Sequence, residues 1–218
     1  MRVNKPRTFR PSVLLVVGPW GSGTTGVMAS LVALGAYVPG PWWMTADPRM
    51  PNSLETAGFR DLLHTLVDEE TVSVVRPEAV TTMLRDYARI VGSLQSRMYR
   101  PIALKHALAA ALLPMLDRVF ELRVIYVMRP IADIAATHRR RDWAAHFGTD
   151  GAHRIYALMD RYRPALKRAP HVVHYTKLLE DPESTLKSMA EFARLRYKPT
   201  AMTAITRPGA PSPEAPAN

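Results

Sequence analysis

The chain has 218 residues, and its 29 lysines and arginines against 19 acidic residues give a net charge of +10. This length, with 47% hydrophobic residues and no cysteine, predicts one globular domain or one domain with a tail, and excludes a disulfide framework, a thiolate nucleophile and a cysteine metal site. The charge favours an anionic partner without choosing among a polyanionic cofactor, an acidic substrate, nucleic acid and a membrane surface.

The basic stretch 1–10 precedes an apolar run of only five residues, 13–17, which is too short for a secretory signal. No apolar run is long enough to span a bilayer. Cytoplasmic residence is therefore the default expectation.

Residues 13–17 are mostly β-branched and predict a buried strand. A turn with three glycines follows, and then a helix over 24–34 that Gly35 ends. Strand, glycine-rich turn and helix together make an architecture that holds a phosphate-like group, because backbone N–H groups and the helix N-terminus converge on an anion. The alternative is a glycine-rich turn with no ligand.

The turn matches the Walker A pattern at Gly18, Gly23 and Thr25. Thr24 occupies the place of the lysine that reaches the phosphates of a nucleoside triphosphate. This substitution argues against ordinary ATP or GTP hydrolysis but leaves the anion cradle intact.

The remaining sequence predicts strands that alternate with helices. We expect further strands at 36–38, 71–75, 101–104, 122–127 and 172–175. We expect helices at 54–68, 77–98, 107–116 with Pro114 near its end, 131–141, 151–168 and 181–195. The alternation indicates a three-layer α/β/α domain over residues 1–198 with a mainly parallel sheet. Residues 199–218 are rich in proline and alanine and predict a disordered tail.

The segment 39–51 is rich in proline and predicts a loop that carries Trp42, Trp43 and Met44. Three large apolar side chains in a loop suggest a lid or a pocket wall. Packing into the core is an equally good interpretation.

Two further strand ends bring basic residues to the crevice where ligands bind in such sheets. Lys105 and His106 follow the strand 101–104, and Arg129 follows the strand 122–127. A magnesium-dependent NTPase would place an aspartate at the second strand end, whereas arginine offers a fork suited to phosphate. The pattern predicts a metal-free site for a phosphate-bearing donor; a surface ion pair between Arg129 and Asp133 is the competing interpretation.

These residues resemble the sulfotransferases that use 3′-phosphoadenosine 5′-phosphosulfate (PAPS), bacterial members in particular. Trp20-Gly21-Ser22-Gly23-Thr24-Thr25 is similar to their 5′-phosphosulfate loop. The spacing of Arg129, Asp133 and Thr137 is similar to their 3′-phosphate motif. A later segment is also similar to the family, through Tyr175, Leu178, Asp181, Pro182, Thr185 and Leu186. The resemblance as a whole covers residues 13–192.

The resemblance implies a P-loop NTPase-like sulfotransferase fold, PAPS as co-substrate, adenosine 3′,5′-bisphosphate (PAP) as product and no metal. It implies that the loop backbone with the hydroxyls of Ser22, Thr24 and Thr25 holds the 5′-phosphosulfate. It further implies that Arg129 and Thr137 hold the 3′-phosphate. Trp20 lies near the adenine or the sulfuryl group, or packs on the sheet.

The implied reaction needs a base to remove a proton from an acceptor hydroxyl or amine. His106 is the first candidate, Glu55 the second and His64 a distant third, with structural roles as the alternatives. Glu55, placed in the first turn of the helix 54–68, would otherwise complement the helix dipole. Lys105 is a candidate for contact with the leaving group, or else an exposed lysine whose stem lies along the surface.

Gly21 departs from the resemblance, because the family carries a basic residue there that stabilises the leaving group. Turnover then requires Lys105 or an arginine from another loop. Thr137 in place of serine keeps the hydroxyl. The late glycine-rich 3′-phosphate loop of the cytosolic animal enzymes is not evident. Arg194, Arg196 and Lys198 are candidates to take its place.

The acceptor is expected to be a small molecule, a lipid or a carbohydrate, with peripheral membrane contact left open and the oligomeric state undetermined. A kinase-like phosphotransferase with an unusual loop and a non-catalytic nucleotide-binding protein remain alternatives. A nucleic-acid partner is not expected, because only the charge favours it and no recognised module is present.

Overall fold

A computed structural model describes residues 10–45 and 52–206 of the chain. Its central sheet contains β1 (Ser12–Val17), β4 (Ile102–Lys105), β5 (Glu121–Met128) and β6 (His171–His174), in the order β4-β1-β5-β6. All three strand pairs are parallel. Because parallel strands end at the same edge, the loops that follow β1, β4 and β5 share one side of the molecule.

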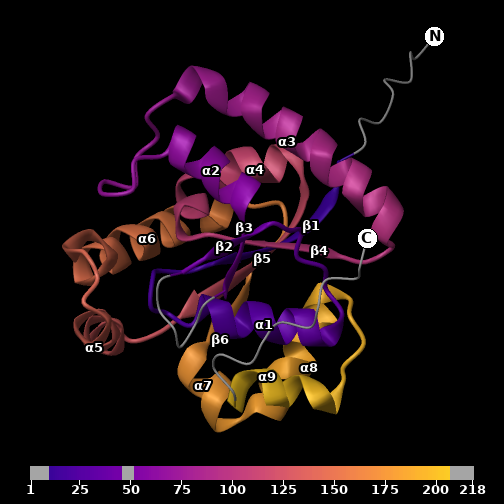
Figure 1. The fold of residues 1–218 in the computed structure, drawn as a ribbon, viewed down its shortest axis with the longest axis vertical. Coiled ribbons are helices and arrows are strands. Elements are labelled where there is room, and N and C mark those ends of the chain that lie inside the picture. The colour runs from indigo at the N-terminus through magenta and orange to yellow at the C-terminus, as the bar shows by residue number, and fades with distance from the viewer. Residues whose placement is uncertain (1–9, 46–51, 207–218) are drawn as a thin grey trace.

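Helices cover both faces of this sheet, which confirms the three-layer α/β architecture (Figure 1). One layer contains α2 (Ala57–Leu66), α3 (Pro77–Met98), α4 (Leu113–Val119) and α6 (Thr149–Tyr162). The other layer contains α1 (Thr24–Leu34), α7 (Tyr175–Glu180), α8 (Pro182–Ala193) and α9 (Thr203–Thr206). Helix α5 (Ile131–Arg141) lies beside α6. None of the helices in the described part of the chain combines the length and the apolar character needed to cross a bilayer.

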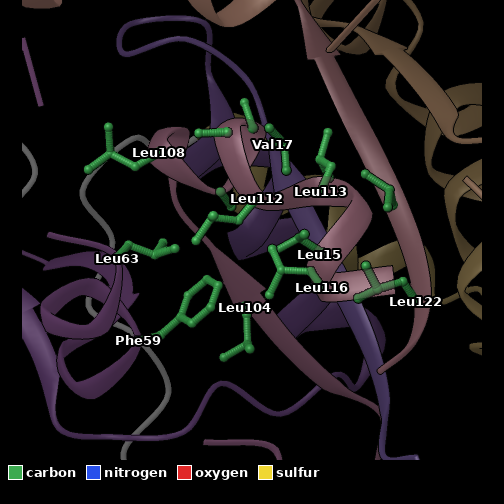
Figure 2. Close-up of a cluster of buried hydrophobic side chains, with 14 of the residues drawn as sticks. Leu15, Val17, Phe59, Leu63, Leu104, Leu108, Leu112, Leu113, Leu116 and Leu122 are labelled. Carbon is green, nitrogen blue, oxygen red and sulfur yellow. The ribbon is translucent and has the colours of Figure 1, made fainter. Parts of the chain in front are cut away.

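Strand β1 supplies side chains to two hydrophobic cores, one on each face of the sheet. Leu15 and Val17 point into the core beneath α2, α3 and α4, where Figure 2 shows them beside Leu104 and the leucines of residues 108–116. Leu14 and Val16 point into the core beneath α1 and α8. Burial on both faces explains why the strand is a continuous apolar run rather than an alternating one.

Four predicted elements are confirmed almost to the residue: the strand at 13–17 and the helices at 24–34, 77–98 and 131–141. Gly35 ends α1 with a φ of 116°, as its position predicts. The strands predicted at 101–104, 122–127 and 172–175 are β4, β5 and β6, each within about one residue.

The prediction of a loop at 39–51 followed by a helix from residue 54 is wrong. Residues 42–44 form β2 (Trp42–Met44), which pairs antiparallel with β3 (Asn52–Thr56), and α2 begins only at Ala57. Asn52 Oδ1 and Ser53 Oγ accept hydrogen bonds from the N–H groups two residues ahead, at 2.8 and 3.2 Å. Short polar side chains make such bonds in turns as well as at helix starts, so these two residues do not distinguish the corner of a hairpin from the start of a helix.

Three further predictions are wrong. Residues 71–75 form no strand, and only an isolated bridge between Val67 and Val74 is present there. The helix expected at 107–116 is a 3₁₀ helix, η1 (Ala107–Leu112), followed by α4, so Pro114 lies at the start of a helix and not near its end. Proline is favoured in a first turn because its missing N–H has no partner there. The strand expected at 36–38 is reduced to one bridge between Tyr37 and Ile102.

The C-terminal elements differ at their boundaries. The helix predicted at 151–168 is α6 followed by a single 3₁₀ turn, η3 (Arg163–Ala165), and α7 was not predicted. Helix α8 begins as expected, with Asp181 Oδ1 accepting from the Ser184 N–H at 3.2 Å. Residues 199–206, expected in the tail, form η4 (Pro199–Met202) and α9, which bury Ala201 and Ile205 against α1. The rest of the predicted tail, the basic lead-in 1–9 and residues 46–51 lie outside the described residues.

Candidate functional site

The loop between β1 and α1 depends on glycine at defined positions. A Cβ on Gly18 would lie 2.7 Å from the carbonyl oxygen of Val127 on β5. A Cβ on Gly23 would lie 2.2 Å from Cδ2 of Tyr175, and Gly23 has a φ of 99°. Real Cβ atoms do not approach so closely, so the loop passes between β5 and Tyr175 only because these two residues lack side chains.

We expect Gly23→Ala to lower the free energy of unfolding by about 3 kcal/mol, since it combines an unfavourable φ with a clash against an aromatic ring. Gly58→Ala in α2 is the matched control, because its Cβ would meet nothing closer than 3.9 Å and alanine favours a helix. Urea unfolding of both variants measures the difference. A Gly23→Ala protein as stable as the wild type would contradict this account of the loop.

Ser22 carries an unusual buried hydroxyl. The residue is fully buried, and its Oγ has no hydrogen-bond partner among the described residues. A buried polar atom without a partner costs about 1–3 kcal/mol. Its place in the loop, directly before the N-terminus of α1, fits a hydroxyl that donates to a bound anion.

Arg129 follows β5 and points back to the loop. Its Nη1 donates to the Gly21 carbonyl at 2.9 Å and to Thr137 Oγ1 at 3.2 Å. Its Nε is buried without a hydrogen-bond partner and lies 3.8 Å from Asp133 Oδ2, and the guanidinium lies 5.4 Å from the centre of the Tyr175 ring. The arginine, the threonine on α5 and the loop, which the sequence placed far apart, therefore form one cluster.

Lys105, the last residue of β4, joins the loop to the β2–β3 hairpin. Its Nζ donates to Thr25 Oγ1 at 3.1 Å and lies 3.0 Å from Glu55 Oε1. The side chains of Lys105 and Glu55 are only 4% and 15% exposed. Burial by itself would raise the pKa of Glu55, but the charge of Lys105, the hydrogen bond that Lys105 donates and the charge of Arg60 act against it, so the pKa is lowered and the carboxyl is ionised at neutral pH.

Glu55 lies in β3 and not in the first turn of a helix, which corrects the predicted placement. The residue before it, Leu54, is buried and has a φ of 57°, a left-handed conformation that leucine rarely adopts. The hydrogen bonds from the Leu54 and Glu55 N–H groups to Asn52 and Ser53 hold this corner in place. The corner turns the Glu55 carboxylate toward Lys105.

His106 is adjacent to this pair but is only 2% exposed. Its Nδ1 accepts from the Leu108 N–H at 3.2 Å, so the neutral ring carries its proton on Nε2, which lies 3.9 Å from Glu55 Oε2. Burial lowers the pKa of His106 to about 4, against the opposing charge of Glu55. The histidine thus begins η1 and faces Glu55 as a neutral group.

The free energy of unfolding should fall as the pH falls from 6.5 to about 4. In this window the unfolded chain binds a proton at His106 that the folded chain does not, and the full shift corresponds to about 3 kcal/mol. His64 and His171 also have lowered pKa values and add to the slope. Urea unfolding at pH 7, 6 and 5 should give a flatter dependence for His106→Asn, which keeps an acceptor for the Leu108 N–H; an unchanged slope would contradict the assignment.

Of the other predicted residues, His64 lies next to His106, whereas Trp20 and the side chains of β2 have other neighbours. The His64 ring lies edge-on to His106 at 5.2 Å between centroids. Trp20 packs on the core beneath α6 and contacts the Phe147 ring at 5.0 Å. On β2, Trp43 is 43% and Met44 is 60% exposed, and the Arg60 guanidinium lies 4.0 Å from the Trp43 ring centre.

Two of the candidates to replace the late glycine-rich loop, Lys198 and Arg194, lie away from the glycine loop. Lys198 Nζ lies 3.6 Å from where a Cβ on Gly35 would be, at the opposite end of α1. Arg194 lines a cavity at the start of β6. Two cavities lined by described residues lie away from the glycine loop.

Two tyrosines support the site without a clear sequence signal. Tyr156 OH on α6 accepts from the Arg129 N–H and donates to the Arg129 carbonyl, each at 2.8 Å. Tyr175 lies across Gly23 and Gly26 and against the Arg129 guanidinium. Only the second lies in a segment that the resemblance had marked.

The solved structures that have this fold include two sulfotransferase domains. One is a sulfotransferase domain from the Synechococcus PCC 7002 olefin synthase, with 17% identical residues and a TM-score of 0.57 over 97% of this chain and 85% of that chain. The other is a sulfotransferase domain from the curacin biosynthetic pathway, with 14% identity and a TM-score of 0.60 over 90% of this chain and 78% of that chain. No family model and no curated protein sequence matches the chain. At these identities the likeness establishes the fold, which is that of the sulfotransferases.

Proposed function

We propose that this protein, which has the sulfotransferase fold, transfers a sulfuryl group from PAPS to a hydroxyl or amine of a small-molecule, lipid or carbohydrate acceptor. The observation that carries the proposal is the hydrogen bond from Arg129 to the Gly21 carbonyl, which joins two cationic features into one cluster. Such a cluster suits a ligand with phosphate groups at two positions. The fold of the neighbouring structures supports the same reaction class.

The described residues fit the donor. Ser22 Oγ and Arg129 Nε are buried polar atoms without a hydrogen-bond partner among the described residues, although Arg129 Nε lies 3.8 Å from Asp133 Oδ2, and both can donate to phosphate oxygens. In the proposal the loop, with Ser22, Thr24 and Thr25, holds the 5′-phosphosulfate. Arg129 and Thr137 hold the 3′-phosphate. When bound, the donor supplies the sulfuryl group and leaves as PAP.

Glu55 is the better candidate for the base. It is ionised, it is more exposed than His106, and its second oxygen is not held by Lys105. The neutral His106 ring presents an N–H rather than a lone pair toward Glu55, so it positions the carboxylate instead of accepting the acceptor's proton. In this proposal the acceptor's proton moves to Glu55.

Lys105 compensates for the missing basic residue at Gly21. Its ammonium contacts Thr25 Oγ1 at the start of α1, on the side where the loop would hold the phosphosulfate. A fixed cation at that place stabilises negative charge that develops on the leaving phosphate. Its burial keeps water from screening that charge.

Calorimetry with PAP in magnesium-free buffer, together with transfer of labelled sulfate from PAPS to a panel of alcohols and amines, tests the proposal. We expect tight PAP binding without metal and sulfation of at least one class of acceptor. Magnesium-dependent ATP binding in place of PAP binding would favour a phosphotransferase. PAP binding without transfer to any acceptor would favour a non-catalytic binding protein. The glycine at position 21, in place of a basic residue that stabilises the leaving group, would explain that result.

A further inference from the structure

A cavity lined by basic residues lies at the end of the central sheet where the strands begin, whereas the glycine loop lies where β1 ends. The cavity, of about 400 Å³, opens beside the first residue of β6 and the last turn of α8, and Arg168, His171, Ser188, Glu191, Phe192 and Arg194 line it. Because β6 runs parallel to β1, the start of β6 lies at the edge where β1 begins, and the glycine loop lies where β1 ends. This cavity takes no part in the proposed transfer.

Arg123 on β5 is not part of the cavity lining, but it interacts electrostatically with two residues of that lining. His171 is in register with Ile125, and strand residues two apart share a face, so Arg123 is on the face of the sheet that carries His171. The cavity residues Arg194 and Arg168 are also the charges that, after burial, lower the pKa of Arg123. Arg123 is only 5% exposed, and its Nε is buried without a hydrogen-bond partner.

Like charges outnumber opposite charges around Arg123. Arg194 and Arg168 lower its pKa and Glu121 raises it, and Arg123 makes no ion pair with a carboxylate among the described residues. A buried charge without an ion-pair partner is destabilising, and a bound anion reduces the penalty.

We propose that Arg168 and Arg194, supported by the buried charge of Arg123, bind the sulfate or phosphate group of a small anionic molecule in this cavity. A volume of about 400 Å³ leaves room for more than a bare ion. The stacked rings of His171 and Phe192, 5.2 Å apart at an interplanar angle of 22°, form an apolar wall for the rest of the ligand. Glu191 at the rim is the one acidic residue of the lining, and it limits the total negative charge that the cavity accepts.

Thermal unfolding in chloride buffer, with sodium phosphate or sodium sulfate added at matched ionic strength, tests the site. We expect either dianion to raise the Tm of the wild type by about 3 °C at ten times its Kd. Arg123→Met and Arg168→Gln should diminish this shift. Arg140→Gln, which removes an exposed cation elsewhere, should keep the full Tm shift. The anion that gives the larger shift of the wild-type Tm, phosphate or sulfate, identifies the chemistry of the ligand.

Arg123→Met gives a second result that a surface ion effect cannot produce. In chloride alone its Tm should exceed that of the wild type, because the unpaired buried charge is gone. A lower Tm in chloride, or an undiminished shift in phosphate and sulfate, would overturn the proposal. Arg129→Ala should keep the shift at this site while losing PAP binding, so the two proposed sites fail separately.

If Arg123→Met does not fold, the wild-type protein still decides the question. Crystals soaked in selenate, which mimics sulfate, should show anomalous density between Arg168 and Arg194. Density at the glycine loop alone would overturn the proposal.

Discussion

Replacing Arg129 with alanine is expected to weaken PAP binding about 100-fold. The guanidinium contacts the loop through the Gly21 carbonyl and contacts α5 through Thr137, and its Nε, 3.8 Å from Asp133 Oδ2, makes no hydrogen bond with the described residues. The change therefore removes a charge-assisted partner and loosens the alignment of the loop at the same time. Isothermal calorimetry with PAP measures the loss directly.

Arg140→Ala is the matched control for Arg129, because it removes the same charge from an exposed position on α5. Its affinity for PAP should stay within about twofold of the wild type, as a distant exposed charge is largely screened. Arg129→Lys should recover part of the affinity, since it keeps the charge but not the planar fork. Equal losses in Arg129→Ala and Arg140→Ala would remove Arg129 from the site.

Replacing Glu55 with glutamine is expected to lower the rate of sulfuryl transfer by about 1,000-fold, the range of a lost general base. The amide has nearly the same shape as the carboxylate and still accepts a hydrogen bond from Lys105, but it cannot take a proton. PAP binding should change little, because Glu55 does not contact the loop directly. Single-turnover transfer and calorimetry on the same preparation separate the two effects.

His106→Asn should lower transfer far less than Glu55→Gln, because asparagine still begins η1 and only the positioning of Glu55 is lost. Glu121→Gln, at an exposed position on β5, controls for the loss of one negative charge. A rate loss for His106→Asn as large as that for Glu55→Gln would return the role of base to the histidine. An unchanged rate in Glu55→Gln would exclude the carboxylate.

Much of the fold was predictable because local pattern and tertiary environment agree. The apolar run 13–17 is buried on both faces, and Gly35 ends α1 as its place after the last apolar residue indicates. Arg129 was placed correctly beside the glycine loop, because parallel strands end at one edge and its position after β5 follows from that strand.

The β2–β3 hairpin was not predictable, because its stability comes from pairing across a connection that carries no local strand signal. Residues 52–56 contain Asn52 and Ser53, whose side chains satisfy backbone N–H groups equally well at a helix start and in this corner. Glu55 was therefore named as a candidate base but was predicted in a helix, whereas it lies in β3. Its contact with Lys105 depends on the distance between two strands that no sequence spacing encodes.

The electrostatics of the site could not be predicted from the sequence either. The free hydroxyl of Ser22 and the protonation of His106 follow from burial, and burial depends on how α1, α2 and η1 pack. A histidine after a strand gives no sign that its Nδ1 is used by Leu108.

The left-handed Leu54 has a consequence for how this protein can evolve. A leucine in that conformation costs about 1 kcal/mol or more, and the chain tolerates it directly beside the carboxylate that it orients. Selection for heat tolerance alone would favour sequences that relax this corner and let the carboxylate drift from the ammonium. Selection for turnover would retain the strain, so the two pressures act in opposite directions on a single peptide unit.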